Sequence, residues 1–212
     1  MNILMFGPNG SGKGTQGALI KKAFGLAHIE SGAIFREHVG GGTELGKKAK
    51  EYMDHGHLVP DEVIIGIINE RLQAEDCKKG YILDGVPRTI AQAEALDKAG
   101  IVFDAVINLE ISDEEILQRM SGRRVCEKCG ASYHVVAIPP KVEGVCDACG
   151  GALVQRADDA PKTVASRLEV YHRETEPLKE YYAKKGNLKE IFNQATVEGT
   201  TQKILEALGQ NV

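Results

Sequence analysis

The sequence predicts an α/β domain in which a parallel β-sheet is flanked by helices. Short apolar runs alternate with longer amphipathic segments, which is the pattern of β–α–β units. The length of 212 residues suffices for one well-buried domain with small insertions, but not for two full domains. Hydrophobic residues make up 42% of the chain and charged residues 26%, close to globular averages, which excludes a disordered or fibrous protein.

Five segments have the length and apolar character of strands. Residues 3–6, 81–83 and 105–109 are the clearest, because each is followed by a polar turn and then by an amphipathic segment. Residues 27–30 and 188–192 show a weaker form of the same pattern. We expect all five in one sheet.

Three helices have recognisable first turns. Ser112 followed by Glu115, and Thr89 followed by Gln92, have the spacing of a capping box, in which the two side chains bind each other's backbone N–H groups. Pro60 is followed by two acidic residues, whose charges favour the positive end of a helix dipole.

Two segments interrupt this alternation. Residues 31–59 contain a run of three glycines between two helical patterns, and residues 123–159 hold four cysteines with little helical periodicity. Both are expected to be insertions at the carboxyl ends of strands. The core domain would then consist of residues 1–30, 60–122 and 160–212.

The charge balance and the hydropathy argue against two classes of partner. The chain has 26 Lys and Arg against 30 Asp and Glu, a net charge of −4, whereas a protein that grips nucleic acid is usually basic. The longest aliphatic run, residues 63–68, is too short to span a bilayer. The first residues show neither a basic leader nor a small-residue cleavage site, so we expect a cytoplasmic protein.

Residues 7–15, with the sequence GPNGSGKGT, follow the first strand and lead into a helix. Glycines allow backbone amides to turn toward a phosphate, the helix N-terminus faces the same point, and Lys13 adds a full positive charge. The alternative is a plain glycine-rich turn, but the order of strand, loop, lysine and helix favours phosphate binding. The generic motif has Ser or Thr directly after the lysine, whereas here Gly14 precedes Thr15.

This departure makes the loop similar to that of the nucleoside monophosphate kinases, and of the adenylate kinases in particular. Residues 84–89 resemble the Asp-Gly-(Phe/Tyr)-Pro-Arg signature of that family, with Val86 in place of the aromatic residue. Residues 31–36 resemble, more loosely, the start of its monophosphate-binding insertion, where Asp-Met-Leu is more common than Ala-Ile-Phe. The segments that resemble the family's lid and return helix are residues 122–124, 155–159 and 167–171.

The resemblance covers essentially the whole chain and implies a P-loop fold and a reversible, Mg²⁺-dependent transfer from ATP to AMP that gives two ADP. Residues 31–59 would close over AMP and the lid, residues 123–159, over ATP. Closure would keep water away from the γ-phosphate. The expected partners are these small nucleotides, and we expect a monomer.

Phosphoryl transfer brings several negative oxygens together, so the site must supply positive charge from several directions. Arginine suits this task because its planar fork binds phosphate and keeps its charge. A single arginine is more often a solvated surface residue, but here several stand at family positions. The expected catalytic residues are Lys13, Asp84, Arg88, Arg123, Arg156 and Arg167. No general base is required, because positioning and electrostatics carry most of the catalysis.

The resemblance also assigns binding residues on the two sides of the site. The residues expected at ATP are Gly10, Ser11, Gly12, Lys13, Gly14, Thr15, Arg119, Arg123, Ser132 and Tyr133. Those expected at AMP are Ser31, Arg36, His57, Leu58, Val59, Gly85, Val86, Pro87, Arg88, Gln92, Arg156 and Arg167. The alternative is a kinase for another nucleoside monophosphate, but family members that act on pyrimidine monophosphates generally have short lids, so the resemblance of this long lid implies AMP.

Four side chains have a second interpretation. Gln92 can bind the adenine edge, cap its own helix, or do both. Asp84 can orient Mg²⁺ through water, or cap the following helix, although Thr89 is better spaced for capping. Asp158 and Asp159 can pair with lid arginines on closure, or form an acidic turn.

Four cysteines have the spacing of a metal knuckle, Cys126-x2-Cys129-x16-Cys146-x2-Cys149. Each Cys-x-x-Cys pair can occupy two corners of a tetrahedron, so we expect a structural Zn²⁺, although iron or cobalt also suits four thiolates. Free buried thiols are the alternative, and disulfides are unfavourable in a reducing compartment. The metal would hold together a lid too small to have its own core.

A histidine of the lid and the remaining cysteine point less clearly to a function. His134, five residues after Cys129, is a possible substitute ligand, but we interpret it as structural or close to the nucleotide. Cys77 shows no partner in the sequence. A nucleic-acid-binding knuckle is the rival interpretation, but only one tyrosine and two lysines lie between Cys126 and Cys149.

Overall fold

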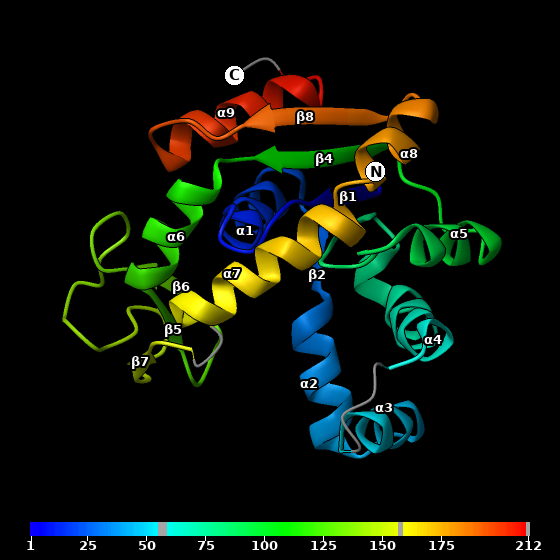
Figure 1. Cartoon of the computed structure of the whole chain (residues 1–212), viewed down its shortest axis with the longest axis horizontal. Helices are drawn as coiled ribbons and strands as arrows, with labels where there is room; N and C mark the ends of the chain where they lie inside the picture. Colours follow the sequence, from blue (N-terminus) through cyan, green and yellow to red (C-terminus); the bar gives the residue numbers. More distant parts are fainter. Residues whose placement is uncertain (55–58, 157–158, 211–212) are drawn as a thin grey trace.

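The structure, a computed structural model, describes residues 1–54, 59–156 and 159–210. Its centre is a parallel sheet in the order β2-β3-β1-β4-β8 (Figure 1). The strands are β1 (Ile3–Phe6), β2 (Ala27–Glu30), β3 (Tyr81–Asp84), β4 (Ala105–Glu110) and β8 (Leu188–Phe192). The predicted fold class and all five predicted strands are confirmed.

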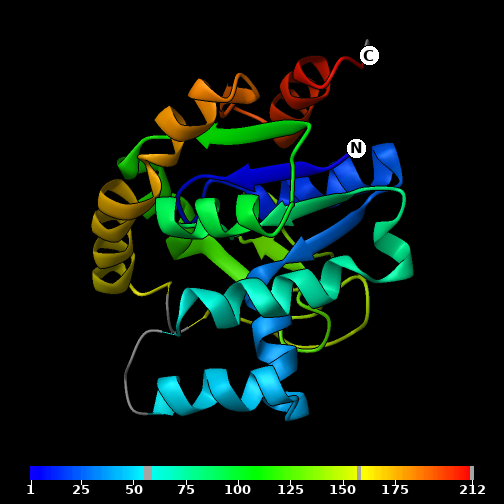
Figure 2. The same cartoon turned by 90° about the vertical axis from the view of Figure 1, so that its right-hand side faces the viewer.

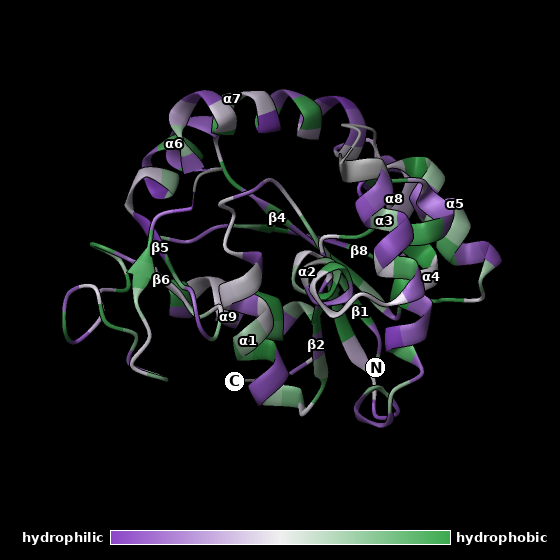
Figure 3. Ribbon diagram, turned by 90° about the horizontal axis from the view of Figure 1, so that it is seen from below, coloured by the Kyte–Doolittle hydropathy of each residue, from purple (hydrophilic) through white to green (hydrophobic). Residues whose placement is uncertain are grey.

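Helices cover both faces of this sheet, as parallel strands require. Strand β1 shows the arrangement most simply, because its side chains alternate between the two faces. Leu4 and Phe6 pack in the larger apolar core, whereas Ile3 and Met5 pack in the smaller one. Figure 3 shows the apolar residues concentrated along the central strands such as β4.

The larger core is closed by α4 (Asp61–Leu72), α5 (Ile90–Lys98) and α8 (Leu178–Lys184). The smaller core is closed by α1 (Lys13–Phe24) and α9 (Val197–Ala207). Full burial of an aliphatic side chain contributes about 1.5–3 kcal/mol, so these two cores fix the strands from which the site loops emerge.

Two of the predicted helix starts have the expected cap. Ser112 Oγ accepts a hydrogen bond from the Glu115 amide at 3.3 Å, and Thr89 Oγ1 accepts from the Gln92 amide at 3.2 Å. The reciprocal contacts differ from a full capping box, because the Glu115 carboxylate lies 3.9 Å from Arg119 and the Gln92 oxygen binds the Arg88 amide.

Residues between β2 and α4 form α2 (Ser31–Gly41) and α3 (Glu44–Asp54), which project away from the sheet (Figure 2). A short 3₁₀ turn, Glu75–Cys77, leads from α4 toward β3. The carboxyl end of β2 runs directly into α2, so the base of this projection lies beside the end of the sheet.

A second excursion leaves the sheet after β4. Helix α6 (Asp113–Gly122) packs against α7 (Pro161–Val170) through the cluster of Ile116, Met120, Val164 and Leu168. Between the two helices, β5 (Arg123–Cys126), β6 (Ser132–His134) and β7 (Leu153–Val154) form a small antiparallel sheet. Helix α7 continues into a π-helical segment, Tyr171–Thr175. In the described residues, no helix is long and apolar enough to cross a bilayer.

Candidate functional site

The glycine-rich loop lies at the carboxyl end of β1, the central strand of the sheet. Gly7 and Gly10 have φ angles of +142° and +88°, which residues with a Cβ rarely adopt. A Cβ at Gly7 would lie 2.8 Å from the Leu109 carbonyl oxygen. The fully buried Ser11 has a hydroxyl that no described group hydrogen-bonds. This backbone fits a cradle for an anionic ligand.

Lys13 opens helix α1 and folds back over the loop. Its ammonium donates to the carbonyl oxygens of Gly7 and Pro8, both at 2.9 Å. Enclosure by protein lowers the pKa of Lys13 to about 8, and the nearby carboxylate of Asp84 only partly offsets this. Two of the three ammonium donors hold the loop, and the third is suited to a phosphate oxygen.

The charges that act on Lys13 come from three separate segments. Asp84, at the end of β3, raises its pKa, whereas Arg88, Arg123 and Arg167 lower it. Asp84 stands beside Met5 in the parallel register, so the sheet itself places this carboxylate next to the phosphate loop. The structure therefore brings four of the other five predicted catalytic side chains close enough to Lys13 for their charges to act on it.

Two of these arginines are held by specific contacts. Arg88 Nε donates to the Gly85 carbonyl oxygen at 2.7 Å, and the Arg88 carbonyl accepts from Thr175 Oγ1 at 2.7 Å. When the side-chain amide of Asn9 is assigned with its oxygen toward α7, this oxygen accepts from Arg167 Nε at 2.9 Å. Asn9 belongs to the glycine loop and was not predicted from the sequence, because its partner lies in a helix far along the chain.

Arg123 is paired with Asp159 at the base of the small antiparallel sheet. Its Nε donates to Asp159 Oδ2 at 2.8 Å, and its Nη2 donates to Oδ1. Arg156 lies partly buried nearby, with its carbonyl oxygen 3.0 Å from the Asp159 amide. Asp158, which was predicted together with Asp159 to pair with a lid arginine, lies outside the described residues.

Asn193 joins three parts of the site that the sequence did not connect. Its Nδ2 donates to the carbonyl oxygens of Ser11 at 3.2 Å and Glu110 at 3.1 Å. Its Oδ1 lies 3.5 Å from Nη1 of Arg119, a residue predicted at ATP. The only signal for Asn193 in the sequence is its place directly after the last parallel strand, at the edge where ligands bind in α/β sheets.

The residues predicted at AMP gather near the end of β3. Ser31 is buried at the start of α2, and a Cβ at Gly85 would lie 2.6 Å from its hydroxyl. Val86 and Pro87 are buried and joined by a cis peptide bond. Val59 is partly buried, while His57, Leu58 and the side chain of Arg36 lie outside the described part of the chain.

Gln92 is buried and its side chain is engaged at both ends. Its oxygen accepts from the Arg88 amide at 2.8 Å, and its nitrogen donates to Asp61 Oδ1 at 2.9 Å. These contacts fix the turn that carries Arg88 and link it to the first residue of α4. One amide hydrogen is left for a further acceptor.

The four predicted metal-binding cysteines converge. Their sulfurs all lie within 4.8 Å of one another, with Cys126 and Cys149 at 3.5 Å and Cys129 and Cys146 at 3.6 Å. Four thiolates around a zinc ion, with Zn–S bonds of about 2.3 Å, have sulfurs about 3.8 Å apart. The donor set and its spacing therefore fit one tetrahedral metal ion. All five cysteines of the chain are free of disulfides.

Neither His134 nor Cys77 belongs to the four-cysteine knuckle, and each has other contacts. His134 Nδ1 accepts from the amides of Val136 at 3.1 Å and Ala137 at 3.0 Å, so this histidine holds its own turn. Cys77 is buried away from the knuckle, with its sulfur 3.0 Å from Arg71 Nη1.

Ser132 is exposed on β6, whereas Tyr133 is buried against Cys126 and Cys146. The Tyr133 hydroxyl and backbone amides lower the pKa of Cys146 to about 6.

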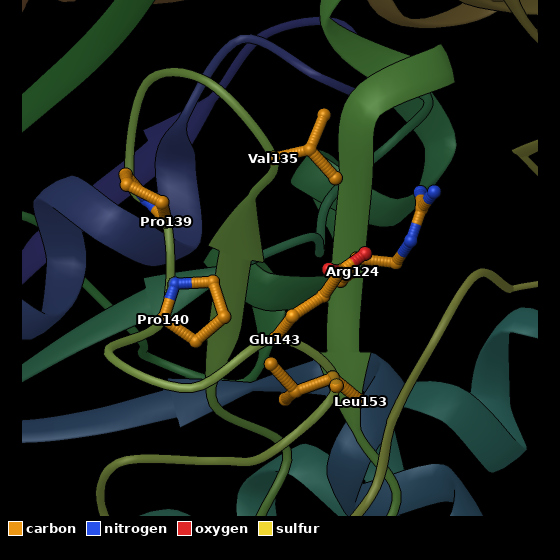
Figure 4. A pocket seen from close by; sticks show the side chains of 7 residues that line it. Arg124, Val135, Pro139, Pro140, Glu143 and Leu153 are labelled. Carbon is orange, nitrogen blue, oxygen red and sulfur yellow. The ribbon is translucent and has the colours of Figure 1, made fainter.

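A cavity of about 510 Å³ lies on this small sheet (Figure 4). Its lining combines apolar groups such as Pro139, Pro140 and Leu153 with Arg124 and Glu143. Arg124 donates to the carbonyl oxygens of Ser121 and of its neighbour, Arg123. No residue of the glycine loop lines the cavity, so it is separate from the anion cradle.

The sequence matches a family model described as adenylate kinase over residues 5–187. The adenylate kinase of Caldicellulosiruptor bescii is 56% identical over 99% of both chains. That of Carboxydothermus hydrogenoformans is 56% identical over 98% of this chain and 99% of the relative. The chain belongs to the adenylate kinase family. A relative from Acetivibrio thermocellus, 51% identical over 98% of both chains, also carries the name adenylate kinase.

Membership of the adenylate kinase family confirms the predicted enzyme class and the P-loop fold. The chain is a nucleoside monophosphate kinase, a transferase that acts on ATP and AMP. The central parallel sheet, with the glycine loop after its first strand, is the scaffold expected for that chemistry.

Proposed function

We propose that the glycine loop and Lys13 bind the β- and γ-phosphates of ATP in the transfer ATP + AMP ⇌ 2 ADP. The loop amides would be contributed by Gly10, Ser11, Gly12, Gly14 and Thr15. The positive-φ glycines and the ammonium held over the loop support this assignment. The ATP phosphates would stabilise the charged form of Lys13, which burial opposes in the free protein.

The transferring phosphoryl group would lie among Arg88, Arg123, Arg156 and Arg167. Charge spreads over its equatorial oxygens during transfer, and guanidinium groups from several directions stabilise that charge. The observation that carries the proposal is the convergence of Asp84, Arg88, Arg123 and Arg167 on Lys13. Catalysis then consists mainly of positioning and electrostatic stabilisation, without a general base.

Family membership implies Mg²⁺ with ATP, and Asp84 is the residue that we assign to it. Its carboxylate is buried, ends β3 beside β1 and faces the Lys13 charge, which suits a hard cation bound through water. The ion would neutralise charge on the phosphate oxygens. Asp84 would orient this ion through the water molecules bound to it.

On the acceptor side, α2, α3 and the following residues up to 59 form the AMP-binding insertion of this proposal. Ser31, Arg36 and residues 57–59 would contact AMP, with the turn from Gly85 to Arg88 facing its phosphate. Gln92 would give its remaining amide hydrogen to adenine, while its other contacts hold Arg88. The close approach of Gly85 to Ser31 supports a shared site.

On the donor side, residues 123–159 form the lid of this proposal, and it would close over ATP. Arg119 would cover the nucleotide. Asn193 would position Arg119 relative to the phosphate loop, because it contacts both Arg119 and Ser11. Arg123 would enter the site from β5, and Ser132 and Tyr133 would lie on the strand beside it. Closure would exclude water from the transferring group.

The lid metal is proposed to be structural Zn²⁺, held by Cys126, Cys129, Cys146 and Cys149. Four thiolates leave no open coordination position, so the ion would stabilise the lid and take no part in transfer. Iron and cobalt suit the same donors. The apolar cluster of the lid is small, which is why a metal is needed to hold it.

We also propose that the protein acts in the cytoplasm, as a monomer and without nucleic acid. Unpaired, clustered thiols suit a reducing compartment. A net charge of −4 disfavours binding to nucleic acid.

A substrate panel tests the acceptor assignment. Purified protein is given Mg-ATP with AMP, CMP, UMP or GMP, and diphosphate formation is measured for each. We expect kcat/KM to be highest with AMP, and a preference for CMP or UMP would contradict the assignment. Gln92→Leu should raise the KM for AMP much more than the KM for ATP.

A further inference from the structure

Tyr133 lies inside the cysteine knuckle. Its side chain is 8% exposed and packs with Cys126 and Cys146 in the apolar cluster of the lid. Its hydroxyl oxygen lies 3.5 Å from Cys146 Sγ and 2.9 Å from the Asp147 amide nitrogen. The hydroxyl therefore has two partners, both in the segment of the second Cys-x-x-Cys pair.

The direction of these two hydrogen bonds follows from the chemistry of the groups. A backbone N–H can only donate, so the Tyr133 oxygen accepts from Asp147. A metal-bound cysteine is a thiolate, which can only accept. The single hydroxyl hydrogen of Tyr133 is therefore left for Cys146 Sγ once a metal is bound.

Such a donor matters because four thiolates around a divalent ion carry a net charge of −2. Hydrogen bonds to the sulfurs spread this charge and hold the ligands in place. The amides of Ala148 and Cys149 also face Cys146, but they belong to its own turn. Tyr133 is a donor from a different element, strand β6.

We propose that Tyr133 is a positioning residue of the metal knuckle, whose hydroxyl donates to the Cys146 thiolate and slows release of the metal. The inference rests on the metal role proposed above. It also connects the metal to the site: Tyr133 pairs with Arg124 in the sheet, and the next pair is His134 with Arg123. The metal would thus hold the strand from which Arg123 extends.

The first test compares zinc release from the wild-type protein, Tyr133→Phe and Tyr182→Phe into an excess of a chromogenic chelator. Tyr133→Phe should release zinc about tenfold faster, the low end of the effect of removing an outer-shell partner. Tyr182 is the matched control, because its hydroxyl is buried without a described partner in the main core. That variant should release zinc at the wild-type rate.

The absorption spectrum of cobalt-loaded protein provides a second measurement, which would not change if Tyr133 only supported the fold of the lid. The sulfur-to-cobalt charge-transfer band should shift in Tyr133→Phe and stay unchanged in Tyr182→Phe. Equal release rates, or superimposable bands, in Tyr133→Phe and wild type would overturn the inference while leaving the metal role intact. Wild-type protein that retains no zinc would instead contradict the metal role itself.

A measurement on the wild type does not depend on the variant folding. With ¹¹³Cd in the knuckle, the Tyr133 hydroxyl proton should exchange slowly with solvent and couple to the cadmium resonance. Removal of the metal should abolish both signals. A rapidly exchanging hydroxyl in the cadmium-loaded protein would contradict the proposed hydrogen bond.

Discussion

The guanidinium of Arg123 forms two parallel hydrogen bonds with the carboxylate of Asp159, whose side chain is fully buried. A planar fork bound to a carboxylate in this way has one defined orientation. Arg123 begins β5 and Asp159 precedes α7, so the pair joins the two chain segments that enter and leave the lid. The pair therefore orients an arginine that we assign to the transferring phosphate.

Asp159→Asn should lower the free energy of unfolding by about 1–3 kcal/mol, because a buried charged partner is replaced by a neutral amide. It should also raise the KM for ATP, since Arg123 loses its orientation. The exposed Arg71–Asp76 pair, with contacts of 2.6 and 2.8 Å, provides the control. Asp76→Asn should cost less stability and leave the KM for ATP unchanged; equal effects of the two substitutions would refute the special role of Asp159.

The lowered pKa of Lys13 predicts a pH dependence of ATP binding. In the free protein Lys13 titrates at a pKa of about 8, and bound phosphates would raise that value. The complex with ATP then holds more protons than the free protein. The affinity for ATP is therefore highest below pH 8 and falls as the pH rises through 8. Between pH 7 and pH 9 the Kd for ATP should increase about tenfold.

Titration calorimetry measures this dependence and the accompanying proton uptake. Lys13→Arg is the control, because a guanidinium keeps its charge over the same range. Its Kd for ATP should vary much less between pH 7 and pH 9. The same pH slope in both proteins would show that another group controls binding.

Metal removal should destabilise the lid. A metal present at about 1,000 times its Kd stabilises the folded state by roughly 4 kcal/mol, and each kcal/mol shifts the Tm of a chain of this size by about 2–4 °C. A strong chelator should therefore lower the Tm by on the order of 10 °C and expose residues 123–159 to proteases. Cys146→Ser should abolish metal binding, whereas Cys77→Ser should retain one metal per chain, because Cys77 lies outside the knuckle. Metal-free wild-type protein with an unchanged Tm would contradict the structural role.

His172 predicts a small pH dependence of stability. Its Nδ1 lies 2.8 Å from Glu176 and its Nε2 3.2 Å from Asp113, and these carboxylates raise its pKa above the usual value. The stabilisation is full below the unfolded pKa of about 6.5 and is lost as the pH rises through the higher folded value. Because the groups are about half exposed, the contribution is below about 1 kcal/mol and is weaker at high salt.

Urea unfolding at pH 6 and at pH 8.5 measures the contribution of His172 to the free energy of unfolding. His172→Gln should lower the free energy of unfolding at pH 6 and have little effect at pH 8.5. If the free energy of unfolding of His172→Gln kept the full pH dependence of the wild type, other groups would be responsible for that dependence.

The sequence predicted the sheet well because strands buried on both faces must be apolar along their whole length. The predicted strands 81–83 and 105–109 each extend by one acidic residue, Asp84 and Glu110, which the hydropathy pattern had placed in the following turns. The order of the strands was not predicted, since it depends on pairing between distant segments.

The site could be predicted from the sequence where one short segment contains the residues that bind a ligand together. The glycine loop with Lys13 and the two Cys-x-x-Cys pairs are such segments. Asn193 and Asn9 were missed because each acts through a partner far along the chain; Asn193 and Ser11 are 182 residues apart. The place of Tyr133 in the knuckle likewise depends on a hydrogen bond to Cys146 that no local pattern indicates.

The most direct test of the central claim, that Lys13 and its loop hold the transferring end of ATP, is ADP formation from Mg-ATP and AMP by Lys13→Ala. Loss of a positive charge at the transferring phosphate should lower kcat/KM at least about a hundredfold. Lys21→Ala, in the last turn of the same helix, should leave turnover unchanged, and both variants should melt within a few degrees of wild type. Near-wild-type turnover by folded Lys13→Ala would contradict the account.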